Sequence, residues 1–334
     1  MQSAAPGTLG ADELARAKGI LAAIDASYSA KVVGQAGLRQ SLLIGLITGG
    51  HILLESVPGL AKTTAAQAIA DAVSGSFKRI QCTPDLLPSD IVGTQVFDYT
   101  TQAFTTQLGP VHANIVLLDE INRSSAKTQS AMLEAMQERQ TSIGGTVYPL
   151  PEPFLVLATQ NPIEQEGTYR LPEAQLDRFL LKEVLDYPEF ADEIEILGRI
   201  DSGVYERTAE SGSTVTIDDV LFLQDAAKRV FIDDSITNYI VSAVYVTRKP
   251  ESYIGKQLAD CIEYGASPRA SIAFSRAARA LALLEGRDHV IPEDVKELRH
   301  VVLRHRIILG FEAIADHVTP ETIIDAIFAA VKVP

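Results

Sequence analysis

Short apolar runs alternate with helix-like segments along the first half of the chain. Residues 11–30 carry apolar side chains at helical spacing, and residues 36–48 predict a second helix that ends at paired glycines. Buried strands are indicated by three apolar runs, at 51–55, 114–118 and 154–158. Because helices fit between these runs, the alternation predicts a parallel β-sheet flanked by helices.

Two segments inside this half predict antiparallel insertions. Residues 96–108 place polar residues around Thr100 between aromatic ones, which is consistent with a hairpin. Residues 141–150 have Gly144 and Gly145 at their centre, a strong two-residue turn signal. Both hairpins could equally serve as simple cover for a sheet edge.

Helical periodicity dominates the second half. The predicted helices are 217–230, 234–247, 268–285, 292–303 and 320–331. Thr216, Ser267 and Thr319 precede three of them as candidate caps. The resulting division is an N-terminal helical segment (1–30), an α/β core (31–190) and a helical domain (191–334), with a polar linker near 201–215.

Composition narrows the class of protein. The chain has 334 residues, 46% of them hydrophobic and 22% charged, which excludes intrinsic disorder. Lys plus Arg total 29 against 43 Asp plus Glu, a formal charge of −14 that argues against coating of nucleic acid. Cys82 and Cys261 have no metal-ligand spacing. There is no signal-peptide pattern, and the longest apolar stretch is too short to span a membrane, so we expect a cytoplasmic protein.

The segment SVPGLAKTT (56–64) follows a predicted strand and precedes an alanine-rich helix, as a phosphate-binding Walker A loop does. Lys62 would supply a positive charge to phosphates, Thr63 a hydroxyl for Mg²⁺, and Gly59 room for a close backbone approach. Ser56 and Ala61 replace the two glycines of the general pattern GxxxxGK[ST]. A Pro-Gly turn before an ordinary helix is the alternative interpretation.

The segment IVLLDE (115–120) is an apolar strand that ends in two acids, the Walker B arrangement. Asp119 would orient Mg²⁺ through water, and Glu120 would act as the base toward an attacking water. Solvated carboxylates at a strand end are the alternative. Together with the phosphate loop upstream, the pair predicts nucleotide hydrolysis.

With these two motifs, the chain resembles the MoxR family of AAA+ ATPases. The stretches that carry the resemblance are VVGQ (32–35), GGHILLESVPGLAKT (49–63), RIQCTPDLLPSDIVG (79–93), ANIVLLDEINRSSAKTQSAMLEAMQE (113–138), LATQNPIEQEGTYRLPEAQLDRF (157–179), SPRA (267–270) and LRHRI (303–307). The resemblance implies a P-loop α/β core with β-hairpin inserts, an all-α lid and assembly into a ring. It also accounts for Ala61, whereas Ser56 departs from the family's glycine. His112 and Cys82 stand where the family has other residues, and we interpret both as packing substitutions.

The resemblance assigns further site residues. It implies adenine contacts by Val33, Gly34 and Gln35, and phosphate contacts by the loop residues Val57, Pro58, Gly59, Leu60, Ala61, Lys62, Thr63 and Thr64. Asn161 matches sensor 1, which positions the attacking water, although an Asn-Pro turn at a strand end would explain it equally well.

Arginines complete the implied site. Arg178 matches the arginine finger that reaches a neighbouring subunit's nucleotide, with a surface pair to Asp177 as the alternative. Arg269 matches sensor 2, which contacts the γ-phosphate in cis. Arg170, at a position where the family usually has proline, is a weak alternative to Arg178. Arg123 could be a second interfacial arginine or only a cation at the start of a helix.

The implied cofactors are ATP and Mg²⁺, and the implied assembly is a homo-oligomer, a hexameric ring. The resemblance implies a chaperone-like remodeller that acts on client proteins, with a partner carrying a von Willebrand factor A domain. Tyr99, Phe104 and Tyr148 of the two hairpins are candidate client contacts. The alternatives are a nucleic-acid-dependent, helicase-like motor, which the net charge disfavours, and a slow nucleotide-gated scaffold.

Overall fold

The computed structural model describes residues 9–57, 59–162, 169, 171–202 and 215–334. The chain divides into two compact units. The sheet unit comprises Ile20–Pro172 and Glu183–Leu221, and the helical unit comprises Met1–Gly19, Glu173–Lys182 and Phe222–Pro334. Pro58 and Arg170, two of the predicted site residues, lie outside the described residues.

A five-stranded sheet forms the centre of the sheet unit, in the order β2-β5-β8-β1-β9. Its strands are β1 (Ile52–Ser56), β2 (Phe77–Gln81), β5 (Ile115–Asp119), β8 (Leu155–Gln160) and β9 (Leu181–Leu185). The pairs β2–β5, β5–β8 and β1–β8 are parallel. The three inner strands are almost wholly buried, which is why their sequences are continuous apolar runs.

The two edge strands escaped sequence prediction. In β2 only Ile80 is buried, so the segment lacks the apolar run that marks an inner strand. In β9 only the terminal residues Leu181 and Leu185 are buried. An edge strand has a neighbour on one side only, and its sequence signal is correspondingly weak.

Helices cover the sheet, and they include the three predicted from the sequence, at 11–30, at 36–48 and directly after the phosphate loop. They are α1 (Ala11–Lys31, shared by both units), α2 (Ala36–Thr48), α3 (Lys62–Ala72), α4 (Pro88–Val92), the 3₁₀ turn η1 (Ile121–Arg123), α5 (Ala126–Glu138) and α7 (Phe190–Asp201). Helix α2 ends at Gly49, which adopts φ 59°, a left-handed conformation that suits glycine.

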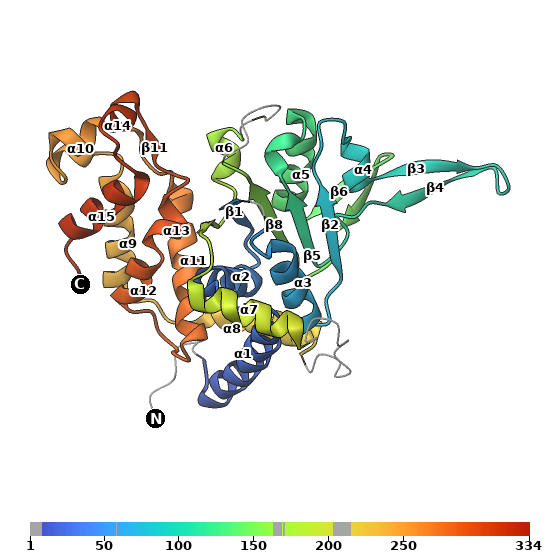
Figure 1. Cartoon of the computed structure of the whole chain (residues 1–334), viewed down its shortest axis with the longest axis horizontal. Coiled ribbons are helices and arrows are strands. Elements are labelled where there is room, and N and C mark those ends of the chain that lie inside the picture. Colours follow the sequence, from blue (N-terminus) through green and yellow to red (C-terminus); the bar gives the residue numbers. More distant parts are fainter. Residues whose placement is uncertain (1–8, 58, 163–168, 170, 203–214) are drawn as a thin grey trace. The chain divides into compact units, whose positions relative to one another are not determined.

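Both predicted hairpins are present. Strands β3 (Gly93–Asp98) and β4 (Ala103–Leu108) form the first, which extends away from the sheet in Figure 1. Strands β6 (Gln140–Ile143) and β7 (Thr146–Pro149) form the second, with Gly144 and Gly145 both at positive φ in the turn. The Tyr148 hydroxyl lies 2.8 Å from that of Thr106, so the two hairpins contact each other.

The helical unit confirms the predicted helices and adds short elements. It contains α6 (Glu173–Leu176), α8 (Ile217–Arg229, begun in the sheet unit), α9 (Asp234–Val246), η2 (Pro250–Ser252), α10 (Lys256–Asp260), α11 (Pro268–Leu284), α12 (Pro292–Glu297), α13 (Arg299–Leu303), α14 (Phe311–Ala315), α15 (Pro320–Ala330) and the pair β10 (Ile262–Tyr264) and β11 (Ile308–Leu309). The helix predicted at 292–303 is two short helices that meet at Leu298, which has φ −78° and ψ −5°.

Small side chains allow close packing in the helical unit. Helix α11 buries six alanines along with Phe274, and the Phe274 and Phe328 rings lie 6.1 Å apart. Caps begin the helices as predicted: Ser267 accepts from the Arg269 amide, and Thr319 from the Thr322 amide.

Candidate functional site

The predicted chemistry lies at one edge of the sheet. Strand β8 pairs with β1 on one side and with β5 on the other, and all three run in the same direction. Their carboxyl ends therefore meet, and they carry the phosphate loop, Asn161 and the acids Asp119 and Glu120. Ligands of open parallel sheets bind at such an edge, where the strand order reverses.

The phosphate loop leads directly into α3. Ala61 precedes the helix in a left-handed conformation (φ 53°, ψ 22°), and the first turn of α3 receives no side-chain cap. Gly59 has φ 88° and open space where a side chain would begin. Uncapped N–H groups at a helix N-terminus beside an open glycine suit the binding of an anion.

Ser56 does not strain this loop. It is the last residue of β1, with extended backbone rather than a positive φ, so the replacement of glycine has no conformational cost. Its side chain is buried, and its Oγ has no hydrogen-bond partner among the described residues.

Lys62 lies at the start of α3 with its amine turned back toward the loop. Its Nζ is 3.4 Å from the Val57 carbonyl oxygen. Burial lowers the pKa of this amine, while the charges of Asp119 and Glu120 act in the opposite direction. Thr63 and Thr64 are exposed beside it. The amine is thus partly desolvated and lies in the electrostatic field of two carboxylates.

One hydroxyl joins the two acids. Thr159 Oγ1 donates to Asp119 Oδ1 over 2.9 Å and accepts from the Glu120 amide over 2.8 Å. Glu120 adopts φ 58° and ψ 53°, a left-handed conformation that is unfavourable for this residue type.

Other polar groups surround the acids. Arg79 of β2 pairs with Asp119, with Nη2 2.5 Å from Oδ2. Glu120 Oε2 accepts from Gln81 Nε2 over 3.2 Å and from Arg123 Nη1 over 3.1 Å. Arg123 is therefore engaged with Glu120 of its own chain.

The remaining predicted residues of the sheet unit lie as follows. Asn161 follows β8 directly and is buried. Gly34 and Gln35 both adopt left-handed conformations, and Gln35 Nε2 donates to the Asp186 carbonyl over 3.1 Å. Gly34 has φ 65°, a conformation that glycine adopts without strain, and its Cα faces the Asp192 carboxylate. Val33 is buried beside them.

Arg178 and Arg269 belong to the helical unit. Arg178 is exposed, and within the described residues its guanidinium forms no ion pair. The predicted alternative, a pair with Asp177, does not occur, because the Asp177 carboxylate is engaged by Arg306 at 2.9 Å and by Ser267 at 2.7 Å. Arg269 lies in the first turn of α11, 3.7 Å from Asp177 Oδ2.

Cys82 and His112, which the sequence predicts as packing substitutions, both contact other protein groups. Cys82 is buried, and its pKa is raised to about 12, chiefly by that burial. His112 Nε2 lies 2.9 Å from the Thr141 hydroxyl. No cluster of three or more potential metal-ligating His, Cys, Asp or Glu occurs among the described residues.

Comparison with known proteins gives the family. The model of the ATPase family associated with various cellular activities (AAA) matches residues 51–181, and that of an AAA lid domain matches residues 256–327. Chaperone MoxR1 of Mycobacterium tuberculosis is 49% identical over 303 residues, which cover 91% of this chain and 79% of that protein. Protein MoxR of Paracoccus denitrificans is 30% identical, with 93% and 95% covered. The chain belongs to the MoxR family of AAA+ ATPases.

A solved structure supports the same assignment. A protein of Cytophaga hutchinsonii assigned as an ATPase superposes with a TM-score of 0.91 at 44% identity, covering 97% of each chain. The chain is thus a nucleotide-binding ATPase with the expected fold, a parallel sheet with hairpin inserts followed by a helical lid region. No helix in the described part of this MoxR-family chain is long and apolar enough to cross a membrane.

Sequence reasoning missed Thr159, Arg79 and Gln81. Thr159 was visible only as a polar residue near the end of the apolar run FLVLATQ. Arg79 and Gln81 lie two residues apart on β2, and in a strand this spacing places both on one face. The position of β2 next to β5 brings that face to the acids, and no local pattern reveals the pairing.

Proposed function

We propose that this MoxR-family ATPase binds ATP with Mg²⁺ at the carboxyl edge of the sheet and uses hydrolysis to assemble or activate client proteins. One observation carries the catalytic part: Thr159 holds Asp119 and Glu120 together next to the strand that supplies the phosphate loop. The chaperone-like part rests on the similarity to a relative named a chaperone.

The described residues fit both the nucleotide and the metal ion. Uncapped amides at the start of α3 and the partly desolvated amine of Lys62 suit the β- and γ-phosphates. The Thr63 hydroxyl and the Asp119 carboxylate are oxygen ligands of the kind that Mg²⁺ prefers, and Asp119 would act through water. The turn at Val33, Gly34 and Gln35 would contact the adenine. The loop residues Val57, Pro58, Gly59, Leu60, Ala61 and Thr64 would line the phosphates.

Glu120 is the proposed base. Within the described residues, both side-chain bonds of its carboxylate end on Oε2, which leaves Oε1 to accept a proton from the attacking water. Asn161, buried at the end of β8, would orient that water with its amide. Mg²⁺ neutralises charge on the phosphates when it is bound.

Glu120→Gln tests the base. The variant keeps the shape of the side chain and loses the proton acceptor, so we expect unchanged ATP affinity and a loss of turnover of at least about 100-fold. Equilibrium binding of a fluorescent ATP analogue and steady-state phosphate release measure the two. Equal turnover in the variant and the wild type would remove Glu120 from this role.

Arg178 and Arg269 are proposed to complete the site in a hexameric ring. The Arg178 guanidinium is exposed and forms no ion pair with any described residue, which suits a group that acts on the next subunit's γ-phosphate. Arg269 would contact the γ-phosphate in cis. Arg123 is held by Glu120 of its own chain, which disfavours it as a second trans arginine.

We also propose that the chain is divided into an N-terminal segment (1–30), an AAA+ core (31–190) and a lid (191–334).

Mixed assemblies test the trans role. Arg178→Ala and Lys62→Ala should each abolish turnover, and rings assembled from both should regain part of it. In such rings the Arg178→Ala subunit keeps an intact nucleotide site, and a Lys62→Ala neighbour supplies the intact Arg178 to that site. Absence of any recovery in coupled ATPase assays would argue against a finger that acts in trans.

The hairpins are the proposed client-binding elements. Tyr99 is 87% exposed and Phe104 is 67% exposed, whereas Tyr148 is half-buried by its contact with Thr106. Phe97 packs edge-on against both exposed rings, which makes a rigid aromatic tip. The proposed partner carries a von Willebrand factor A domain, and the proposed location is the cytoplasm.

A further inference from the structure

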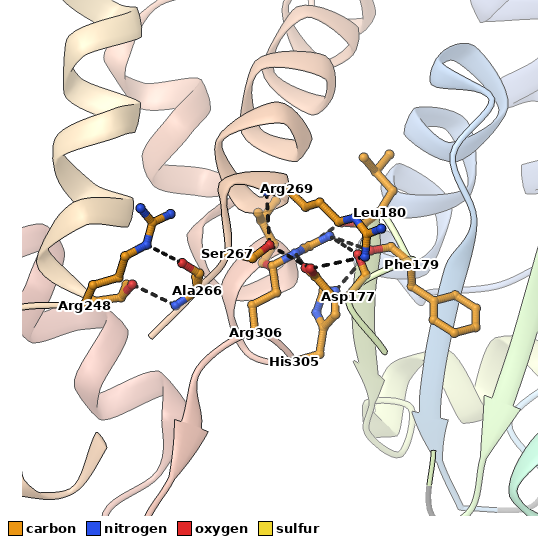
Figure 2. Close-up of polar contacts among 11 residues, drawn as sticks. Asp177, Phe179, Leu180, Arg248, Ala266, Ser267, Arg269, His305 and Arg306 are labelled. Carbon is orange, nitrogen blue, oxygen red and sulfur yellow. Dashed lines mark hydrogen bonds and ion pairs between the residues drawn. The ribbon is translucent and has the colours of Figure 1, made fainter. Parts of the chain in front are cut away.

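A polar cluster that includes the buried side chain of Arg306 joins the segment of Arg178 to the segment of Arg269 within the helical unit. Asp177 lies at its centre (Figure 2). Arg306 Nε donates to Asp177 Oδ1 over 2.9 Å, and Ser267 Oγ donates to Oδ2 over 2.7 Å. Arg269 Nη1 approaches the same Oδ2 at 3.7 Å.

Arg306 binds the backbone around Arg178 as well as the Asp177 side chain. Its guanidinium donates to the carbonyls of Phe179 over 2.6 Å and Leu180 over 3.1 Å. The Arg306 side chain is 2% exposed, and burial lowers its pKa to about 10, so it stays charged at neutral pH. Such a buried, fully hydrogen-bonded guanidinium fixes geometry rather than meeting solvent.

His305 strengthens the same attachment. Its Nε2 lies 3.2 Å from the Phe179 carbonyl oxygen, and the Phe179 side chain is fully buried. The residues on both sides of Arg178 are thus immobilised against the segment LRHRI (303–307), while the Arg178 side chain remains exposed.

Ser267 connects this attachment to Arg269. Its hydroxyl donates to Asp177 and accepts from the Arg269 amide over 3.1 Å, so one oxygen caps α11 and holds the residue that precedes Arg178. Asp177 Oδ2 therefore faces both Ser267 and the Arg269 guanidinium.

We propose that Asp177 and Arg306 are positioning residues that set the orientation of Arg178 toward the neighbouring subunit and link it to the state of Arg269. This inference rests on the proposed roles of Arg178 in trans and Arg269 in cis. When the Arg269 guanidinium engages a phosphate, Asp177 loses one of its two positive neighbours and keeps Arg306. The nucleotide in one site thereby alters how the finger for the next site is held.

Mixed rings show whether a variant damages the nucleotide site of its own subunit or the arginine finger that it supplies to the next subunit. Asp177→Asn and Arg306→Lys should each lower turnover at least tenfold while binding of a fluorescent ATP analogue stays unchanged. Mixed with Lys62→Ala subunits, they should regain turnover. Mixed with Arg178→Ala subunits, they should regain none, because both partners then lack a working finger. Arg287→Ala, which removes a partly buried ion pair with Asp294 elsewhere in the helical unit, is the control and should keep wild-type turnover.

Two variants without a change of charge serve as a second test if Asp177→Asn or Arg306→Lys fails to fold. Ser267→Ala and Thr319→Ala each remove a helix cap in the helical unit, but only Ser267 binds Asp177. We expect a several-fold loss of turnover for Ser267→Ala, with the same mixing pattern, and none for Thr319→Ala.

The outcomes separate the two proposals. The positioning role of Asp177 and Arg306 alone is overturned by either of two results. One is recovery of turnover when Asp177→Asn subunits are mixed with Arg178→Ala subunits, and the other is equal turnover of the Ser267→Ala and Thr319→Ala variants. Failure of the Lys62→Ala and Arg178→Ala mixture overturns the trans finger, and the linkage with it.

Discussion

At the scale of the residue, the site depends on one threonine hydroxyl. Thr159 Oγ1 donates to the Asp119 carboxylate and accepts from the Glu120 amide, so it aligns the side chain of one acid and the backbone of the next. The left-handed backbone of Glu120 costs on the order of 1 kcal/mol, and the bond to its amide is one of the contacts that hold it.

Thr159→Val removes this hydroxyl and keeps the shape of the side chain. Hydrogen bonds to charged groups contribute about 1.5–3 kcal/mol, so we expect turnover to fall roughly 10- to 100-fold, with nucleotide affinity little changed. Steady-state ATPase assays measure the loss. Thr141→Val, which alters a buried threonine bonded to His112, should leave turnover unchanged. Equal losses in both variants would point to general destabilisation.

At the scale of the element, the segment between α13 and β11 carries two buried charged or titratable side chains. Arg306 is paired with Asp177, whereas His305 is fully buried and its Nδ1 has no hydrogen-bond partner among the described residues. Burial lowers the pKa of His305 well below its usual value, and the charge of Arg306 acts in the same direction. His305 is therefore neutral in the folded protein, and its Nε2–H donates to the Phe179 carbonyl.

Acid should destabilise the helical unit through His305. The unfolded chain takes up a proton at His305 near pH 6.5, whereas the folded chain does not, so the free energy of unfolding falls as pH drops below about 6.5. One proton accounts for at most about 1.4 kcal/mol per pH unit. Denaturant unfolding followed by circular dichroism at pH 7.5 and 5.5 measures the fall. His305→Gln should show a smaller one, and an identical fall would exclude His305 as its source.

At the scale of the whole molecule, the charge of −14 coexists with a few functional cations. In the proposed ring, one triphosphate meets Lys62 and Arg269 of its own subunit and Arg178 of the neighbouring subunit. A large negative net charge opposes association with phosphate backbones, and non-specific binding to nucleic acid requires clustered Lys and Arg. The charge therefore favours proteins as clients over nucleic acids.

Nucleic acid should not stimulate the ATPase. We expect turnover to change less than twofold when single-stranded DNA, double-stranded DNA or RNA is added at physiological salt. A parallel series at low salt tests for weak electrostatic binding. Strong stimulation at physiological salt would favour the helicase-like alternative, and turnover too slow to sustain a cycle would favour the nucleotide-gated scaffold.

The sequence by itself determined the inner strands, the phosphate loop and the two acids. Their signals are local: an apolar run followed by Lys62 and Thr63, or by Asp119 and Glu120, is complete within about ten residues. The caps Ser267 and Thr319 were equally visible, since a cap bonds to an amide two or three residues away.

Only the tertiary structure decided what holds these residues. Arg79 and Thr159 reach Asp119 because β2 and β8 pair with β5 on either side, and strand pairing leaves no mark within either strand. Arg306 binds Asp177 from 129 residues away, so a spacing rule cannot find the pair. The site residues themselves can be predicted because their signals lie in neighbouring residues. The side chains that hold them in place come from distant parts of the sequence, and only the folded backbone brings those parts together.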